Sequence, residues 1–240
     1  MNTKLFTDKG NLKMIAHRGV SGLERENTCP AFVAAGVKSY YGVETDVRMT
    51  KDGKFIISHD GDLMRVGGLN ISIEESTFTE LRKVRLKDTD DVTVREDLCL
   101  PSLQEYIAIC RKYDKQSILE LKGEFAQDKI VKMVELIQSM GWLERTTFIS
   151  FCGENLVSLK NVFPNADVQF LSMKCGEEEI AFMEKHGFGA DLYHKVITKE
   201  LVETLHSKGI KVNCWTVDDL DTAARMRDCG VDFITSNILE

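Results

Sequence analysis

The sequence predicts an α/β protein of the (β/α)8, or TIM-barrel, class from three observations. Eight short apolar runs with strong β propensity alternate with segments of helical periodicity. From residue 146 onward the runs begin at 146, 167, 190, 211 and 232, so one strand–helix unit recurs every 21–23 residues. The 240 residues suit one barrel, and we expect a single domain over residues 1–240. The runs cover 13–17, 42–48, 116–121, 146–151, 167–172, 190–194, 211–217 and 232–236.

The segments between these runs carry helix signals. Ser102 and Glu105 form a capping box, in which each residue bonds the other's backbone N–H. Apolar residues then follow at helical spacing, and a second stripe begins at Ile130. An open, doubly wound sheet is the alternative architecture. No Gly-x-Gly-x-x-Gly follows any strand, which disfavours a nucleotide-binding sheet of that kind.

A ninth apolar run, residues 55–59, follows the second too closely for a parallel crossover, which needs a dozen or more residues. We therefore predict an antiparallel hairpin with Asp52-Gly53 at its turn. A two-residue loop would pair Lys51 with Lys54 and place Asp46 opposite His59. A three-residue loop with a bulge would shift this register by one residue.

Residues 60–100 interrupt the alternation of strands and helices. The segment contains several glycines and an acidic stretch, and we expect a small insertion that passes over the barrel mouth. Residues 77–82 favour a short helix within it. Leu100-Pro101 marks the return to the barrel.

Charged side chains gather at the predicted strand ends. Glu44 and Asp46 project from the same face of one strand, because side chains alternate along a strand. Two adjacent carboxylates repel each other in a protein interior, and a divalent cation is the natural ion to lie between them. His17-Arg18 and Glu120-x-Lys122 end two other strands. In a barrel these ends meet at one face, where active sites are found.

Composition excludes some functions. The net charge is −7 and the basic residues are dispersed, so extended nucleic-acid binding is not expected. No run of 18 apolar residues indicates a membrane span, and the first residues do not form a signal peptide. The seven cysteines are odd in number and form no Cys-x-x-Cys. We expect free thiols and a cytoplasmic location.

These motifs, in this order, resemble the glycerophosphodiester phosphodiesterase family over nearly the whole chain. Three places depart from the family pattern, with Arg25 in place of proline, Val66-Gly67 in place of threonines and Thr235-Ser236 in place of Thr-Asp. The matching segments are His17-Arg18-Gly19, Glu26-Asn27-Thr28, Glu44-Thr45-Asp46-Val47, Thr50-Lys51-Asp52-Gly53, His59-Asp60, Leu100-Pro101-Ser102-Leu103, Glu120-Leu121-Lys122, Ser150-Phe151, Trp215-Thr216-Val217 and Gly230-Val231-Asp232-Phe233-Ile234-Thr235.

The resemblance implies metal-dependent hydrolysis of glycerophosphodiesters to sn-glycerol 3-phosphate and an alcohol. It implies one divalent cation, Mg²⁺ or Ca²⁺, held by Glu44, Asp46 and Glu120, which suits hard oxygen ligands. His17 and His59 are expected as the general acid and base, since imidazole titrates near neutral pH. The expected substrate contacts are Arg18 and Lys122 to the phosphate and Trp215 to the glycerol or head group.

Several interpretations stay open. Glu120 could simply pair with Lys122, and Trp215 could be an ordinary core aromatic residue. The same groups would serve a lysophospholipase D that acts on lysolipids, although residues 60–100 offer only scattered apolar residues for an acyl chain. A non-catalytic barrel that binds a phosphate ligand is the third possibility.

Overall fold

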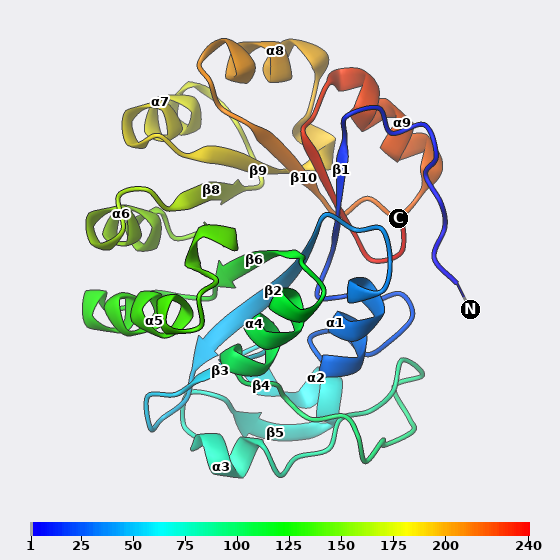
Figure 1. Ribbon diagram of the computed structural model, residues 1–240, viewed down its shortest axis with the longest axis vertical. Coiled ribbons are helices and arrows are strands. Elements are labelled where there is room, and N and C mark those ends of the chain that lie inside the picture. The colour runs from blue at the N-terminus through cyan, green and yellow to red at the C-terminus, as the bar shows by residue number, and fades with distance from the viewer. Residues whose placement is uncertain (1) are drawn as a thin grey trace.

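A computed structural model describes residues 2–240 as a closed barrel of eight parallel strands surrounded by helices (Figure 1). The sheet runs in the order β1-β11-β10-β9-β8-β7-β6-β2, and the parallel pairing of β1 with β2 closes it. The predicted TIM barrel and all eight predicted strands are confirmed. The strands are β1 (Lys13–Ala16), β2 (Gly42–Met49), β6 (Gln116–Leu121), β7 (Thr146–Ser150), β8 (Asp167–Ser172), β9 (Gly189–Tyr193), β10 (Val212–Trp215) and β11 (Phe233–Ser236).

Helices connect consecutive barrel strands and cover the outside of the sheet (Figure 1). The predicted capping box begins α4, with Ser102 and Glu105 each bonding the other's backbone N–H. After β11 the chain end pairs with the start of the chain, where the Phe6 N–H donates to the Glu240 carbonyl. The helices are α1 (Cys29–Gly36), α4 (Leu103–Lys112), α5 (Gln127–Ser139), α6 (Gly153–Val162), α7 (Glu177–His186), α8 (Lys199–Ser207) and α9 (Leu220–Cys229), with 3-10 turns η1 (Leu143–Arg145) and η2 (His194–Val196).

The hairpin is present, but the register predicted from a two-residue loop is wrong. Strand β3 (Phe55–Ile57) pairs antiparallel with β2, and Val47 lies opposite Ile57. The Ser58 N–H therefore donates to the Asp46 carbonyl, so Ser58 and not His59 faces Asp46. The loop has three residues because Gly53 adopts a positive φ of 72°, as in a type I turn closed by a left-handed residue.

The insertion forms a small layer beside β3 and carries its own apolar core. It contains β4 (Asp62–Leu63), α2 (Met64–Gly67), β5 (Leu69–Ser72) and α3 (Phe78–Leu81), and its buried side chains cluster around Ile56 and Leu100. The predicted short helix at 77–82 is confirmed as α3. Arg25, where the family pattern has proline, lies buried and donates to the backbone carbonyls of Lys87 and Asp88. Its guanidinium fixes the outer loop of the insertion to the barrel.

Apolar side chains fill the lower part of the barrel and leave the upper part for polar groups. Ile15, Ile118 and Ile149 meet there with residues from two further strands. The inward-facing residues nearer the strand ends are mostly charged or polar, as in Glu44, Asp46 and Glu120. The barrel core thus fixes the strands, and their carboxyl ends present the functional side chains.

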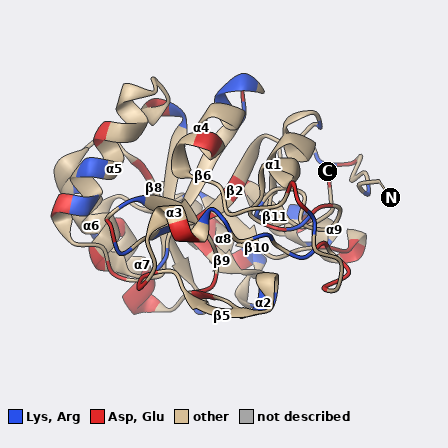
Figure 2. Ribbon diagram, turned by 90° about the horizontal axis from the view of Figure 1, so that it is seen from below, with Lys and Arg blue, Asp and Glu red and all other residues tan. Residues whose placement is uncertain are grey.

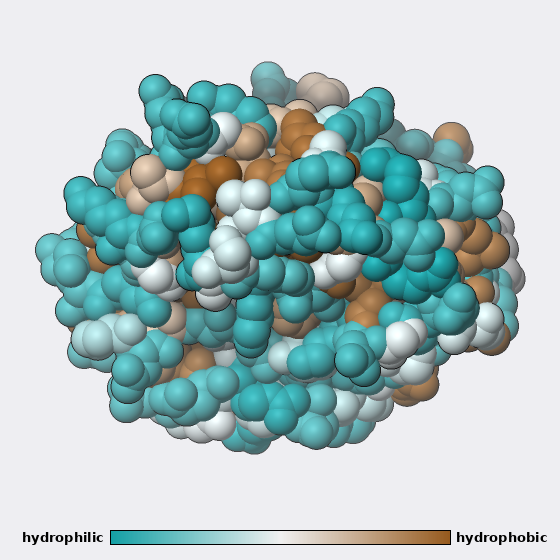
Figure 3. Space-filling view, turned by 90° about the horizontal axis from the view of Figure 1, so that it is seen from above, coloured by the Kyte–Doolittle hydropathy of each residue, from teal (hydrophilic) through white to brown (hydrophobic). Residues whose placement is uncertain are grey.

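The surface mixes both signs of charge. Figure 2 shows acidic and basic segments interspersed along the helices and loops. The face in Figure 3 is largely hydrophilic, with small apolar patches between the polar side chains. In residues 2–240, no helix is long and apolar enough to cross a bilayer.

Candidate active site

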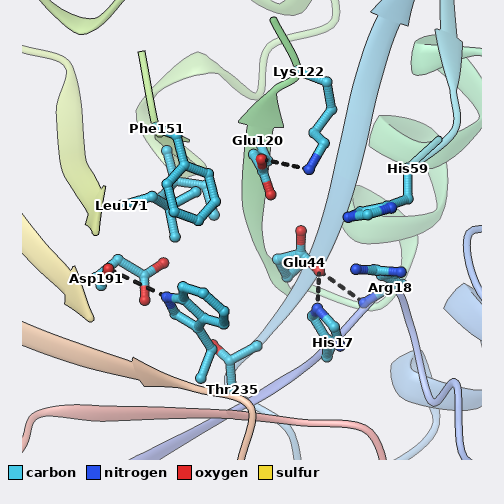
Figure 4. A pocket seen from close by; sticks show the side chains of 12 residues that line it. His17, Arg18, Glu44, His59, Glu120, Lys122, Phe151, Leu171, Asp191 and Thr235 are labelled. Carbon is cyan, nitrogen blue, oxygen red and sulfur yellow. Dashed lines mark hydrogen bonds and ion pairs between the residues drawn. The ribbon is translucent and has the colours of Figure 1, made fainter. Parts of the chain in front are cut away.

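A pocket opens at the carboxyl ends of the barrel strands (Figure 4). Seven of the eight residues proposed from the sequence line it, and the eighth, Asp46, lies directly beneath them. None of its lining residues comes from 60–100, so the insertion flanks the mouth and does not line this pocket. The lining residues are His17, Arg18, Glu44, His59, Glu120, Lys122, Ile149, Phe151, Leu171, Asp191, Trp215 and Thr235.

The three predicted ligand carboxylates converge in this pocket. Glu44, Asp46 and Glu120 each offer an oxygen within 4.8 Å of the others, and all three side chains are buried. Burial and the neighbouring Asp46 raise the pKa of Glu44 well above its usual range and that of Glu120 to about 7. Burial alone would also raise the pKa of Asp46, but nearby cations, Arg18 foremost, lower it to about 2.

These residues fit a hard divalent cation. Oδ1 of Asp46 is buried and accepts no hydrogen bond, and the Lys122 ammonium lies 3.5 Å from it. Carboxylates whose pKa values are raised by mutual repulsion gain most from a bound cation, because it neutralises the charge that burial disfavours. Oxygen ligands on rigid strands are the set that Mg²⁺ and Ca²⁺ prefer.

Two basic side chains border the carboxylates. The Arg18 guanidinium bonds Glu26 at 2.8 Å and lies 3.4 Å from Asp46, and its Nε has no hydrogen-bond acceptor. The Lys122 ammonium lies 2.8 Å from Glu120, so the ion pair that was the alternative to a ligand role is present within the acid cluster. Both cations face the pocket, where an anion would find them.

The backbone at Arg18 and Gly19 adopts positive φ angles of 53° and 77°. This turn aims the Arg18 N–H at Glu44, to which it donates at 2.8 Å. A Cβ on Gly19 would lie only 2.6 Å from the backbone of Ala31, so helix α1 can approach the loop only if this residue is glycine. The His17-Arg18-Gly19 motif therefore sets backbone geometry as well as supplying side chains.

A hydrogen-bond chain fixes the tautomer of His17. Asn237 donates from Nδ2 to the Asp218 carboxylate at 2.6 Å, so its Oδ1 faces His17 Nδ1 at 2.7 Å and must accept. His17 Nδ1 therefore carries the proton, and Nε2 faces the pocket, 3.9 Å from Glu44. Burial and the charge on Arg18 lower the pKa of His17 to about 4, which keeps the ring neutral at pH 7.

His59 has a charged partner instead. Its Nδ1 lies 2.7 Å from the Asp60 carboxylate, which also accepts from Arg65 Nε at 2.7 Å. Arg65 in turn forks onto Glu26 at 2.6 and 2.8 Å. The pKa of His59 is lowered overall, because burial and the charges of Arg18 and Lys122 outweigh the carboxylates of Asp46 and Asp60, which raise it. Through Arg65 the insertion holds the residues that orient both His59 and Arg18.

With this geometry in place, the chain can be compared with known proteins. The sequence matches the model of the Glycerophosphoryl diester phosphodiesterase family over residues 17–239. The chain belongs to this family. The family consists of phosphoric diester hydrolases, and the chain is an enzyme of that class.

Individual family members agree in length and fold. A glycerophosphodiester phosphodiesterase of Caldanaerobacter subterraneus is 28% identical over 230 residues, which cover 93% of each chain. A solved glycerophosphodiester phosphodiesterase of Parabacteroides distasonis is 28% identical with a TM-score of 0.78, over 95% of this chain and 93% of that one. A phosphodiesterase of Oleispira antarctica, solved with the product sn-glycerol-3-phosphate, shares the fold with a TM-score of 0.86 at 24% identity, over 98% of this chain and 96% of that one.

In this member of the glycerophosphoryl diester phosphodiesterase family, Trp215 lines the pocket and is not an ordinary core aromatic residue. Its ring packs edge-on against Phe151, with ring centroids 5.7 Å apart, and its indole N–H donates to the Asp191 carbonyl at 3.2 Å. Phe151 itself is 46% exposed. These two aromatic side chains give the pocket one apolar wall beside the charged groups.

Sequence reasoning assigned no role to two residues of this site, Asn237 and Asp191. For Asn27 it left open a contact to the phosphate region or an orienting role in the first loop; the Asn27 amide donates to Asp46 at 2.7 Å and accepts from Thr45. Asn237 lies 220 residues from the histidine that it orients, so no local pattern could indicate it. The sequence did contain a signal for Asp191. Side chains alternate along a strand, so this acid points to the side opposite that of Ala190 and Leu192, and that side is the barrel interior.

Proposed function

We propose that this chain hydrolyses glycerophosphodiesters to sn-glycerol 3-phosphate and an alcohol with the help of Mg²⁺ or Ca²⁺. One observation carries the proposal: three buried carboxylates, two histidines and two cationic side chains gather at one pocket, at the ends of several strands. The family description and the curated relative support phosphodiester hydrolysis. The roles of individual residues below are part of the proposal.

In this proposal Glu44, Asp46 and Glu120 hold the cation through one oxygen each. When bound, the cation supplies positive charge that stabilises the developing negative charge on the phosphoryl oxygens. Arg18 and Lys122 contribute further positive charge from the chain itself. Arg18 can bond two phosphate oxygens at once, and Lys122 acts as a point charge.

The two histidines divide the proton transfers. His17 is neutral with Nε2 free, so it can accept the proton of the attacking hydroxyl as the phosphorus–oxygen bond forms. His59 Nδ1 lies within hydrogen-bond distance of the Asp60 carboxylate, and this negative charge favours the imidazolium form. Its Nε2 proton can then pass to the alkoxide that leaves phosphorus, so the alcohol departs uncharged.

Two nucleophiles fit this arrangement. The glycerol hydroxyl beside the phosphate can attack first, and water then opens the resulting cyclic phosphate. Alternatively, water attacks phosphorus directly. A substrate without that neighbouring hydroxyl separates the two routes, because only direct attack by water would still release the alcohol.

Steady-state hydrolysis of glycerophosphocholine tests the proposal. We expect turnover with Mg²⁺ or Ca²⁺, loss of turnover in excess chelator, and its return when the cation is restored. His17→Ala and His59→Ala should each lower kcat by about 10²–10⁴-fold, the usual contribution of a general acid or base. Full turnover in chelator would remove the cation from the mechanism, and near wild-type rates for either variant would remove that histidine.

His206→Ala is the matched control. His206 pairs with Asp232 on the surface, outside the pocket, and is partly exposed. Its replacement should leave kcat unchanged. Urea unfolding of all three variants would separate a loss of chemistry from a loss of fold.

The lysolipid alternative is less favoured by the insertion. Of its apolar residues near α2, Leu63 is fully buried, and only Met64 and Leu69 are exposed. These side chains do not form a continuous trough beside the lining residues. A non-catalytic barrel would have no chemical need for both histidines together with the three acids. We also propose the cytoplasm as the compartment, since all seven cysteines are free thiols.

A further inference from the structure

One carboxyl group of the pocket has no part in the chemistry above. Asp191 lies on β9, opposite Leu171 of β8 and Asn213 of β10, and is 2% exposed. Its Oδ1 is buried and has no hydrogen-bond partner. Figure 4 shows the side chain on the far side of the pocket from His17, Arg18 and His59.

The surroundings of Asp191 satisfy its carboxyl group only in part, because Asn213 is a side-chain hydrogen-bond partner while Oδ1 stays unpaired and Glu120 is a neighbouring like charge. Asp191 makes no ion pair with any of the described residues, and Trp215 bonds only its backbone carbonyl. The aliphatic side chains of Ile149 and Leu171 line the same part of the pocket. A buried polar atom left unpaired is costly, so such an atom that lines a pocket is expected to meet a ligand.

The ligand group must be one that can donate a hydrogen bond in an apolar setting. A phosphate oxygen would find no cation here to neutralise its charge. A hydroxyl donates one hydrogen bond without bringing charge, and burial, which raises the pKa of Asp191 well above its usual range, favours an uncharged pair. The carbon chain that carries the hydroxyl would lie against Leu171 and Trp215.

We infer that Asp191 is a specificity-determining residue that binds the terminal hydroxyl of the substrate's glycerol moiety, the one farther from phosphorus. This inference rests on the proposed function, which places the phosphate at Arg18 and Lys122. The hydroxyl next to the phosphate must stay near phosphorus and the histidines. The terminal hydroxyl is one bond farther from phosphorus and can point away from the histidines, toward the opposite wall.

A consequence concerns lysolipids. An acyl ester at the terminal hydroxyl removes its proton and adds a chain on the side where the buried Ile149 and Leu171 line the pocket. The group that recognises free glycerol would therefore disfavour 1-acyl substrates. A site built to bond a hydroxyl rejects analogues that lack it, because its own polar group is then left unpaired.

The test compares glycerophosphocholine with its analogue that lacks only the terminal hydroxyl and keeps the one beside the phosphate. Wild type should prefer the full substrate by about 10- to 100-fold in kcat/KM. Asp191→Val should reduce this preference to less than threefold, whereas Asp191→Asn, which keeps an acceptor oxygen, should retain most of it. Asp167→Val, at the opposite end of the barrel and exposed, is the control and should keep the wild-type preference.

Equal turnover of the two substrates by wild type would overturn the inference, and so would an equal loss on both substrates in Asp191→Val. If Asp191→Val does not fold, calorimetry with wild type and Asp191→Asn decides. With Mg²⁺ present, glycerol 3-phosphate should bind at least tenfold more tightly than propane-1,2-diol phosphate, and equal affinities would again overturn the inference. The absence of turnover of any glycerophosphodiester would instead contradict the proposed function.

Discussion

At the scale of single residues, the partners of the two histidines distinguish their roles. His17 faces a neutral amide, Asn237, whereas His59 faces the carboxylate of Asp60. A carboxylate stabilises the charged ring and an amide does so much less. We therefore propose that the same side chain acts as the base in one position and as the acid in the other.

Asp60→Asn tests this division. The carboxylate raises the pKa of His59, so its removal lowers that pKa. A general acid must be protonated to act, and the alkaline limb of the kcat/KM profile should therefore move to lower pH. We expect kcat to fall by about 10-fold or more at pH 8 and by less at pH 6.

The matched control is Glu74→Gln, which removes an exposed carboxylate of the same insertion that pairs with Arg48 of β2. Its profile should coincide with that of wild type. A profile for Asp60→Asn that falls uniformly at every pH would show that Asp60 only positions the ring.

Much of this site was predictable at the residue scale. Glu44, Asp46 and Glu120 stand at the ends of strands, where alternation and barrel geometry bring side chains together. Asn237 and Asp191 were not predictable. Asn237 contacts a histidine 220 residues away in the sequence, and a role for Asp191 can be recognised only when the pocket that it lines is known. Pairwise partners that the fold creates leave little trace in local sequence.

At the scale of elements, a sequence pattern that is compatible with only one structure predicted that structure correctly. The capping box at Ser102 fixed the start of α4, and the alternation of runs fixed the barrel strands. The hairpin had two solutions one residue apart, and the sequence motif Asp52-Gly53 suits both. The three-residue loop is accompanied by contacts that sequence could not reveal: Asp52 accepts from the Thr50 hydroxyl and from the Phe78 N–H of the insertion.

Ser102→Ala should lower the free energy of unfolding by about 1 kcal/mol, because it removes the side-chain half of the capping box. Activity should be unchanged, since α4 contributes no residue to the pocket. Urea unfolding measures the difference. Ser139→Ala, whose exposed hydroxyl bonds a carbonyl of its own helix, is the control and should change stability by less than about 0.5 kcal/mol. Equal losses would mean that the cap does not stabilise α4.

At the scale of the whole molecule, the barrel is closed by hydrogen bonds, and carboxylates at its site repel one another. Glu44 and Glu120 are buried beside Asp46, and their raised pKa values mean that their ionised forms destabilise the fold. The insertion shares ion pairs with the barrel, through Arg48 and Arg65 among others. We propose that residues 1–240 unfold as one domain.

Glu44→Gln should relieve this conflict. Because the folded pKa of Glu44 is raised, the native state holds more protons than the unfolded state above about pH 4.3, so metal-free stability falls as pH rises from there. The variant should be as stable as wild type at pH 4 and more stable at pH 8. Its thermal midpoint should not respond to Mg²⁺, whereas saturating Mg²⁺ should raise that of wild type by about 5–10 °C.

Glu135→Gln, on the exposed face of α5, serves as control and should behave as wild type in both respects. A thermal midpoint of wild type that ignores Mg²⁺ and Ca²⁺, or a Glu44→Gln variant that still responds, would contradict a cation site at these carboxylates.

A crystal structure of the protein soaked with Mn²⁺ and sn-glycerol 3-phosphate examines the central claim most directly. We predict one anomalous peak bounded by oxygens of Glu44, Asp46 and Glu120, with the phosphate between Arg18 and Lys122. A peak elsewhere, or carboxylates that remain bound only to Arg18 and Lys122 at saturating Mn²⁺, would contradict it.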